Sequence, residues 1–131
     1  MGAWGTGPFD NDGAGDFVWT VTDGGGLSVI EDAFDHVLEA GGEDLEAPSA
    51  EEAIAAAAIV ARLKDGAPLA DEVEAWIASE QPKVTDTLIA KARHALQRVM
   101  TAPSELLELW QESDEFPAFQ AGIGALLQRL G

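Results

Sequence analysis

One stretch of sequence decides the fold class: AIAAAAIVA at residues 53–61, which is apolar on every side. A helix of this composition has no polar face, so other elements must cover it all round. We therefore expect this segment at the centre of an all-α protein. Its small side chains would let neighbouring helices approach it closely.

Capping signals predict where the helices begin. Ser28 and Ser49 are each followed three residues later by a glutamate, which is the pattern of a capping box. Ser104 and an Asp or Asn within residues 10–12 are expected to cap two further helices, because their side-chain oxygens accept N–H groups of the first turn. Pro68 is expected at the first position of the helix after the central one.

Glycines and a proline predict where the helices end. The breaks fall at Gly24–Gly26, Gly41–Gly42, Asp65-Gly66 and Pro82. Between these breaks apolar residues recur at helical spacing, and no segment alternates as a half-buried strand would. The chain is therefore predicted to form a single compact bundle of six or seven short helices.

The length of the chain predicts a single domain. Its 131 residues are expected to form one helical unit over 1–131, with an irregular glycine-rich segment at 1–9. A short α-solenoid-like stack of helix hairpins is the alternative, although no repeated signature accompanies it. The chain has no cysteine, which excludes a disulfide scaffold, a thiolate zinc site and a cysteine nucleophile. No cofactor is expected.

The charge of the chain is strongly negative and unevenly distributed. The formal net charge is −17, from 24 acidic residues against 7 Lys and Arg. Residues 1–61 contain thirteen of the acids and no Lys or Arg. Such a surface repels phosphate groups, which argues against nucleic acid and anionic membranes as partners. A charged partner would be a basic protein or a cation.

Targeting signals are not evident in the sequence. The N-terminus lacks the positive region and apolar run of a secretory signal. The apolar run at 54–61 is far shorter than the ~20 residues that span a bilayer. We therefore expect a cytoplasmic protein.

One helix is predicted to carry the basic surface. Lys83, Thr87, Lys91, His94 and Arg98 follow one another at steps of three or four residues, which places them on one stripe opposite the core. This stripe either faces solvent or packs against the acidic first half. We favour the second arrangement, because unopposed acids repel one another.

The opening residues resemble a known family pattern. MGAWGTG at 1–7 is followed by Phe9, Asn11-Asp12, Ala14 and Asp16, and three later stretches are similar. The later stretches are LEAP at 45–48, the helix of Trp76-Ile77, and SEL with ELW within 104–110. Together they resemble the bacterial domain-of-unknown-function family DUF4259, which often has an acid where this chain has Gly13. The resemblance implies a cytoplasmic, stand-alone helical domain and supplies no catalytic or ligand-binding residue.

An acidic cluster near the N-terminus is the first candidate site. Asp12, Asp16, Trp19 and Asp23 share one stripe of the first predicted helix, away from its apolar side. Carboxylates beside an aromatic ring suit a cationic ligand or an Arg or Lys side chain of a partner. Three carboxylates also suit a hard cation such as Mg²⁺ or Ca²⁺.

A structural interpretation of the same cluster stays open. The glycine-rich segment would fold back so that Trp4 or Phe9 covers Trp19. His36 is a further candidate, because Asp32 lies one helical turn before it. Together with an Asp of the first helix, Asp32 and His36 could ligate a metal or act as a base with its orienting acid. A lone helical histidine beside acids is more often a surface residue.

These observations favour a non-catalytic module that binds a basic protein through an acidic face, such as an inhibitor, an immunity-like protein or a regulator. The candidate binding residues are Trp4, Asp12, Asp16, Trp19, Asp23 and His36. Two alternatives remain: a metal-dependent hydrolase with an Asp/His site, and a structural unit that forms oligomers.

Overall fold

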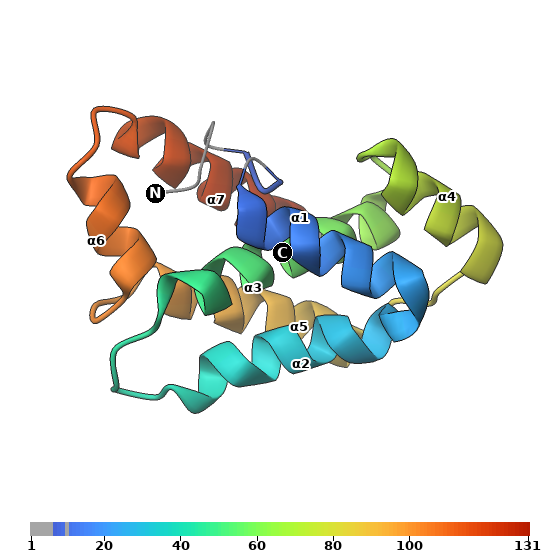
Figure 1. The fold of residues 1–131 in the computed structure, drawn as a ribbon, viewed down its shortest axis with the longest axis horizontal. Helices are drawn as coiled ribbons and strands as arrows, with labels where there is room; N and C mark the ends of the chain where they lie inside the picture. Colours follow the sequence, from blue (N-terminus) through green and yellow to red (C-terminus); the bar gives the residue numbers. More distant parts are fainter. Residues whose placement is uncertain (1–6, 10) are drawn as a thin grey trace.

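The computed structural model describes residues 7–9 and 11–131, and these form an all-α bundle without a β-strand (Figure 1). The helices of this described part, with one π-type segment, are α1 (Asp12–Thr20), η1 (Val21–Gly25), α2 (Gly26–Glu39), α3 (Ala47–Asp65), α4 (Asp71–Glu80), α5 (Asp86–Val99), α6 (Glu105–Gln111) and α7 (Phe116–Leu130). The predicted fold class is confirmed.

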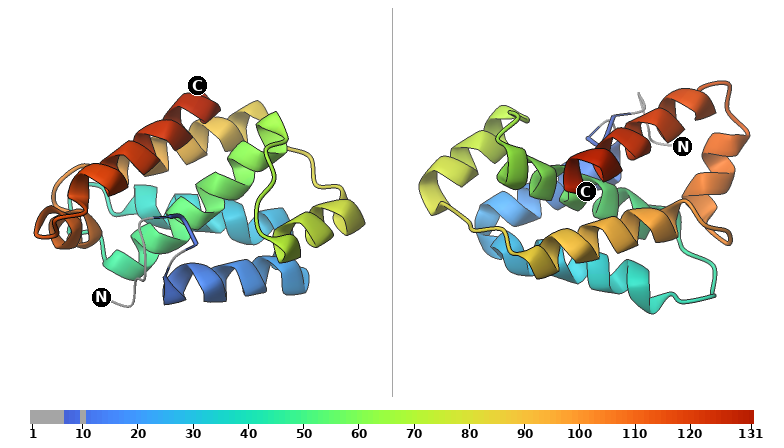
Figure 2. Two further views of the ribbon diagram at one scale, coloured as in Figure 1. Left: turned by 90° about the horizontal axis from the view of Figure 1, so that it is seen from above. Right: turned by 180° about the vertical axis from the view of Figure 1, so that it is seen from behind.

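Helix α3 lies at the centre of the bundle, as its composition predicts. Every residue from Ala53 to Ala61 is buried. Helix α3 packs against α1, α2, α5, α6 and α7, whereas α4 and α6 lie at opposite ends of the long axis (Figures 1 and 2). In a solenoid each unit contacts only its neighbours. Because α3 packs against five other helices, the fold is a bundle and not a stack of hairpins.

The predicted helix ends are largely confirmed. Helix α3 ends at Asp65, and Gly66 follows in the left-handed conformation at φ 81°. Gly41 also has a positive φ, of 55°, directly after the C-cap of α2. At the first helix, Oδ1 of Asn11 accepts the N–H of Ala14 at 2.7 Å, which is the predicted cap.

The break at Gly24 has an unexpected form. The backbone leaves helical geometry at Asp23 and at Gly24, whose φ is 109°, yet η1 joins α1 to α2 across this kink. Because the chain enters α2 through the kink, the helix begins at Gly26 and not at a capped serine. The predicted capping box at Ser28 is therefore wrong.

Of three other predicted helix starts, the one at Ser104 is placed correctly and the other two are wrong. Helix α3 begins at Ala47, before Ser49. The N–H of Ala47 donates to Oε1 of Glu105, a residue far along the chain, at 2.8 Å. Ser104 does precede α6, but its hydroxyl makes no capping bond and is buried. Pro68 lies in the loop before α4 and not in its first turn.

Apolar side chains from every helix meet around α3. The rings of Trp110 on α6 and Phe119 on α7 stack with centroids 5.0 Å apart, which fixes the α6–α7 corner. Phe34 and Ile30 of α2 are fully buried in the same core. Within the described residues, no helix combines the length and the apolar character needed to cross a membrane.

Candidate functional site

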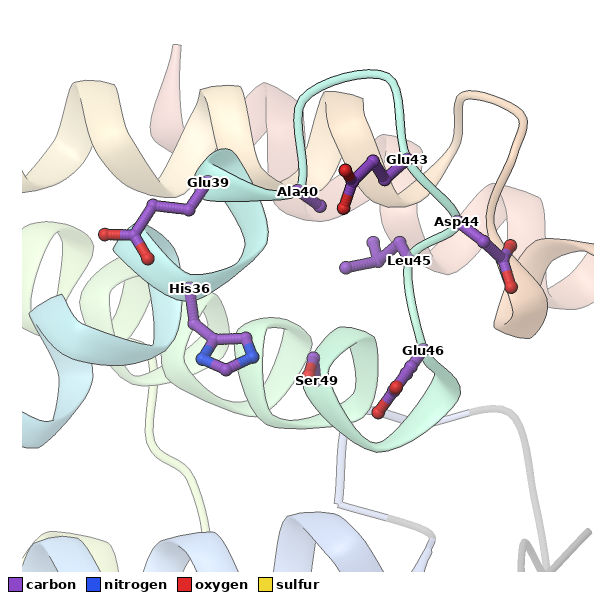
Figure 3. Close-up of a pocket in the computed structure, with 8 residues that line it drawn as sticks. All are labelled: His36, Glu39, Ala40, Glu43, Asp44, Leu45, Glu46 and Ser49. Carbon is purple, nitrogen blue, oxygen red and sulfur yellow. The ribbon is translucent and has the colours of Figure 1, made fainter.

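A pocket opens between the end of α2, the loop that follows it and the first turns of α3. Its volume is about 440 Å³. Figure 3 shows the imidazole of His36 above the first turns of α3, beside Ser49, while the loop residues follow the opposite side. The lining residues are His36, Glu39, Ala40, Glu43, Asp44, Leu45, Glu46 and Ser49.

A second hollow continues this pocket between α1, α2 and α3. It has a volume of about 260 Å³ and shares His36 and Ser49 with the first. Its other lining residues are Phe17, Val29, Asp32, Ala33, Pro48 and Glu52. We call the two hollows together the acidic groove.

Carboxylates dominate the charge of the acidic groove. Its lining contains six of them, and neither Lys nor Arg: Asp32, Glu39, Glu43, Asp44, Glu46 and Glu52. The ion pairs among the described residues join Arg62 to Glu74, Lys91 to Glu31 and Asp35, and Arg129 to Asp65. None of these pairs includes a carboxylate of the groove, so among the described residues no Lys or Arg forms an ion pair with its acidic side chains.

Two neighbouring carboxyls near the start of α3 are harder to ionise than usual. Burial raises the pKa of Glu52 above its usual range, and the adjacent His36 opposes part of that increase. Burial also raises the pKa of Glu51, and the charge of Asp12 raises it further. Both carboxylates would be more stable beside a cation than they are alone.

Arg98 of α5 holds the loop that forms one wall of the groove. Its Nε donates to the carbonyl of Gly41 at 2.9 Å, and its Nη2 donates to the carbonyl of Glu43 at 2.6 Å. The same guanidinium donates to the carbonyls of Thr101 and Pro103, at 2.7 and 2.9 Å. One arginine therefore joins two loops through four hydrogen bonds to backbone carbonyls.

A backbone bridge fixes the far end of the same loop. The N–H of Leu45 donates to the carbonyl of Pro103 at 3.1 Å, and the N–H of Glu105 donates to the carbonyl of Leu45 at 2.8 Å. Leu45 is itself buried. The acidic loop is therefore anchored at both ends, and its carboxylates are held at the rim.

The predicted basic stripe is divided by the structure. Lys91 pairs with Asp35 at 2.9 Å, and Arg98 binds the loop after α2, so both pack against the acidic first half as we favoured. Lys83, Thr87 and His94 are exposed. Neither of the two packed cations reaches the groove carboxylates.

The α1 candidates lie outside the groove. Asp12, Asp16 and Asp23 are exposed, and Trp19 keeps 62% of its surface exposed. The kink at Asp23 removes this residue from the regular helical stripe on which the sequence places it. Trp4 lies outside the described residues, while Phe9 packs against the core.

His36 is the predicted residue that the structure places in the groove, together with Asp32. The acids of the loop, Glu43, Asp44 and Glu46, were missed. Their spacing carries no signal, because their place depends on Arg98 far along the chain. Within the described residues no three His, Cys, Asp or Glu side chains are placed to hold a metal ion.

Comparison with known proteins identifies the family. The family model described as Domain of unknown function (DUF4259) matches residues 2–122. The chain belongs to this family. The DUF4259 match covers the resemblance seen in the opening residues and confirms it. Comparisons with curated proteins and with solved structures gave no match.

Proposed function

We propose that this DUF4259 domain is a non-catalytic interaction module that binds a basic segment of a partner protein in the acidic groove. One observation carries the proposal: six carboxylates line a continuous groove, and none of them has an ion-pair partner among the described residues. A partner that brings Lys or Arg would supply the missing counter-charge and would be steered toward the groove from a distance.

The groove also indicates the chemistry of that segment. Phe17, Val29 and Pro48 line the hollow between α1, α2 and α3, whereas Glu43 and Glu46 line the other hollow beside the loop. The partner is therefore an extended segment with an apolar residue next to Lys or Arg. The aliphatic stems of the basic residues would lie along the loop while their charged ends reach the carboxylates.

A protein with this surface could act as an inhibitor, an immunity-like protein or a regulator, since each covers a basic surface of its target. We expect the interaction to take place in the cytoplasm. The domain contributes charge and shape to this interaction and performs no chemical step.

The proposal is tested with a fluorescent peptide that carries leucine and several arginines. We expect anisotropy to show binding that weakens steeply as salt is added, because screening reduces attraction between exposed charges. In the test variant, the loop changes are Glu43→Gln, Asp44→Asn and Glu46→Gln. This variant should bind at least about tenfold more weakly, which corresponds to ~1.4 kcal/mol.

A matched control removes the same charge elsewhere. Glu108→Gln, Glu112→Gln and Asp114→Asn change exposed residues at the α6 end of the bundle, outside the groove. This control should bind the peptide within about twofold of the unaltered protein. Salt screens the attraction between the peptide and charges that lie far from the groove, so removing them has little effect. Equal losses in the two variants would show that net charge alone attracts the peptide and would refute a groove.

A further inference from the structure

A separate pocket lies at the kink between α1 and α2, where the end of α4 approaches η1. Its volume is about 300 Å³, at the lower end of the range for small-molecule sites. The lining residues are Thr22, Gly24, Gly26, Leu27, Trp76, Glu80 and Pro82. None of them lines the acidic groove, so the two sites are independent.

The walls of this pocket combine aliphatic and aromatic surface. Leu27, Trp76 and Pro82 are the large apolar residues of its lining. Trp76 is only 7% exposed, so the packing of α4 against the core holds the ring in one position. These three residues offer a ligand a rigid apolar wall.

The lining of the pocket contains one charged side chain, and it is acidic. Glu80 is the single charged residue of its lining, and among the described residues it has no ion-pair partner. Glu80 is also the last residue of α4, whose last turn contains no basic side chain. The carbonyl groups at a helix C-terminus favour positive charge, and here no Lys or Arg of the helix supplies it.

The glycines of the kink keep the pocket open. Gly24 has φ 109° and Gly26 has φ 61°, and residues other than glycine rarely adopt these backbone conformations. A Cβ atom built on either glycine would meet no atom of a more distant residue within 4 Å, so no other part of the fold covers these two backbone positions. A ligand can therefore approach the backbone directly.

We propose that this pocket binds a small organic cation, an ammonium group that carries apolar substituents. The ammonium lies beside the carboxylate of Glu80, and its substituents pack against Trp76 and Leu27. A metal ion would not need the apolar walls, and a neutral ligand would leave Glu80 without a counter-charge. This inference does not rest on the function proposed for the acidic groove.

Choline is a suitable probe, with 3,3-dimethylbutan-1-ol as its neutral analogue of the same shape. We expect choline to shift the amide NMR signals of Thr22, Gly24 and Leu27 and the indole signal of Trp76, and the alcohol to shift them much less. The titration should extend to roughly 50 mM, well above a millimolar dissociation constant. Absence of shifts at these positions, or equal shifts with the alcohol, would overturn the proposal.

A charge-neutral variant tests the role of the carboxylate. Glu80→Gln should weaken choline binding about fivefold, which corresponds to ~1 kcal/mol for an exposed ion pair. Glu72→Gln is the matched control, because Glu72 is exposed on the same helix and does not line the pocket. If Glu80→Gln binds choline as well as Glu72→Gln does, the ammonium does not lie beside Glu80 and the assigned site is wrong.

Discussion

Arg98 is the residue on which the shape of the candidate site depends most. Its guanidinium donates to four carbonyl oxygens, in the loop after α2 and in the loop before α6. A planar guanidinium presents five N–H donors in a fixed arrangement, so one side chain can satisfy several acceptors that no lysine could reach together. The positions of Glu43 and its neighbours follow from this contact.

Replacing this arginine should destabilise the protein measurably. Arg98→Met keeps most of the aliphatic stem and removes all four hydrogen bonds, so we expect the free energy of unfolding to fall by about 2 kcal/mol. Urea denaturation followed by circular dichroism measures the change. Arg93→Met is the control, since Arg93 is exposed, and it should stay within about 0.5 kcal/mol. Equal effects of the two changes would show that the Leu45 bridge alone holds the loop.

Single residues also show how far a sequence can predict a site. Spacing on one helix associates Asp32 with His36, and the structure places both in the acidic groove. The three loop acids join them because Arg98, more than fifty residues away, fixes the loop. Trp19 illustrates the opposite case. It lies on α1 with Asp12 and Asp16 as predicted, but 62% of its surface is exposed and it lines no part of the groove. Long-range contacts of this kind leave no local pattern.

At the scale of elements, α3 explains why the helices pack so closely. Its residues 53–61 are buried on every side of the helix, and Ala56 and Ala57 have no exposed surface. Because these buried side chains are no larger than a methyl group, they allow the helices around α3 to approach it closely. The same feature makes the fold class readable from AIAAAAIVA at 53–61, because a helix without a polar side has one possible location.

A larger side chain in α3 should separate its neighbours. Ala57→Leu adds volume where no space is free, so we expect the free energy of unfolding to fall by about 1–3 kcal/mol. Thermal and urea denaturation provide the measurement. Ala78→Leu on α4 is the control, because Ala78 is exposed, and it should change stability by no more than about 0.5 kcal/mol. A loss as small as that of the control would mean that the bundle adapts to the added volume.

Helix ends were easier to predict than helix starts, for a physical reason. An end at Gly66 or Gly41 requires only a local left-handed conformation, which glycine adopts without strain. The starts at Ser28 and Ser49 were wrong because other groups satisfy the first turns. The chain runs from η1 straight into α2, and Glu105, from a distant part of the chain, accepts the N–H of Ala47 at the start of α3.

At the scale of the whole molecule, carboxyls of two opposite kinds control the response to acid. Hydrogen bonding to Arg129 holds the pKa of Asp65 far below its ordinary value of 3.8, and hydrogen bonding to Arg62 lowers that of Glu74 from 4.5. Burial instead raises the pKa of Glu51 and of Glu52 above 4.5. The two kinds therefore dominate in different ranges of pH.

Stability should pass through a maximum as the pH falls. Glu51 and Glu52 bind protons more readily in the folded state, so acidification from neutral pH toward 4.5 should stabilise the protein. Below the ordinary values of 4.5 and 3.8, the unfolded state binds protons more readily at Glu74 and Asp65, so stability should fall again. The melting temperature measured across this range tests both limbs.

Two variants separate the two contributions to this profile. Asp65→Asn should flatten the acidic limb, because it removes the carboxyl that Arg129 binds. Glu52→Gln should flatten the rise between neutral pH and 4.5, because it removes a carboxyl that burial makes hard to ionise. A monotonic loss of stability from neutral pH downward would contradict this account.

The contact between Arg98 and the two loops has one more consequence, for how this family can vary its ligand. All four acceptors of Arg98 are carbonyl oxygens of the backbone, and none of them belongs to a side chain. The side chains of Glu43, Asp44 and Glu46 can therefore be exchanged without removing a hydrogen bond of this arginine. Substitution at these three positions would alter the selectivity of the groove while its framework is inherited unchanged.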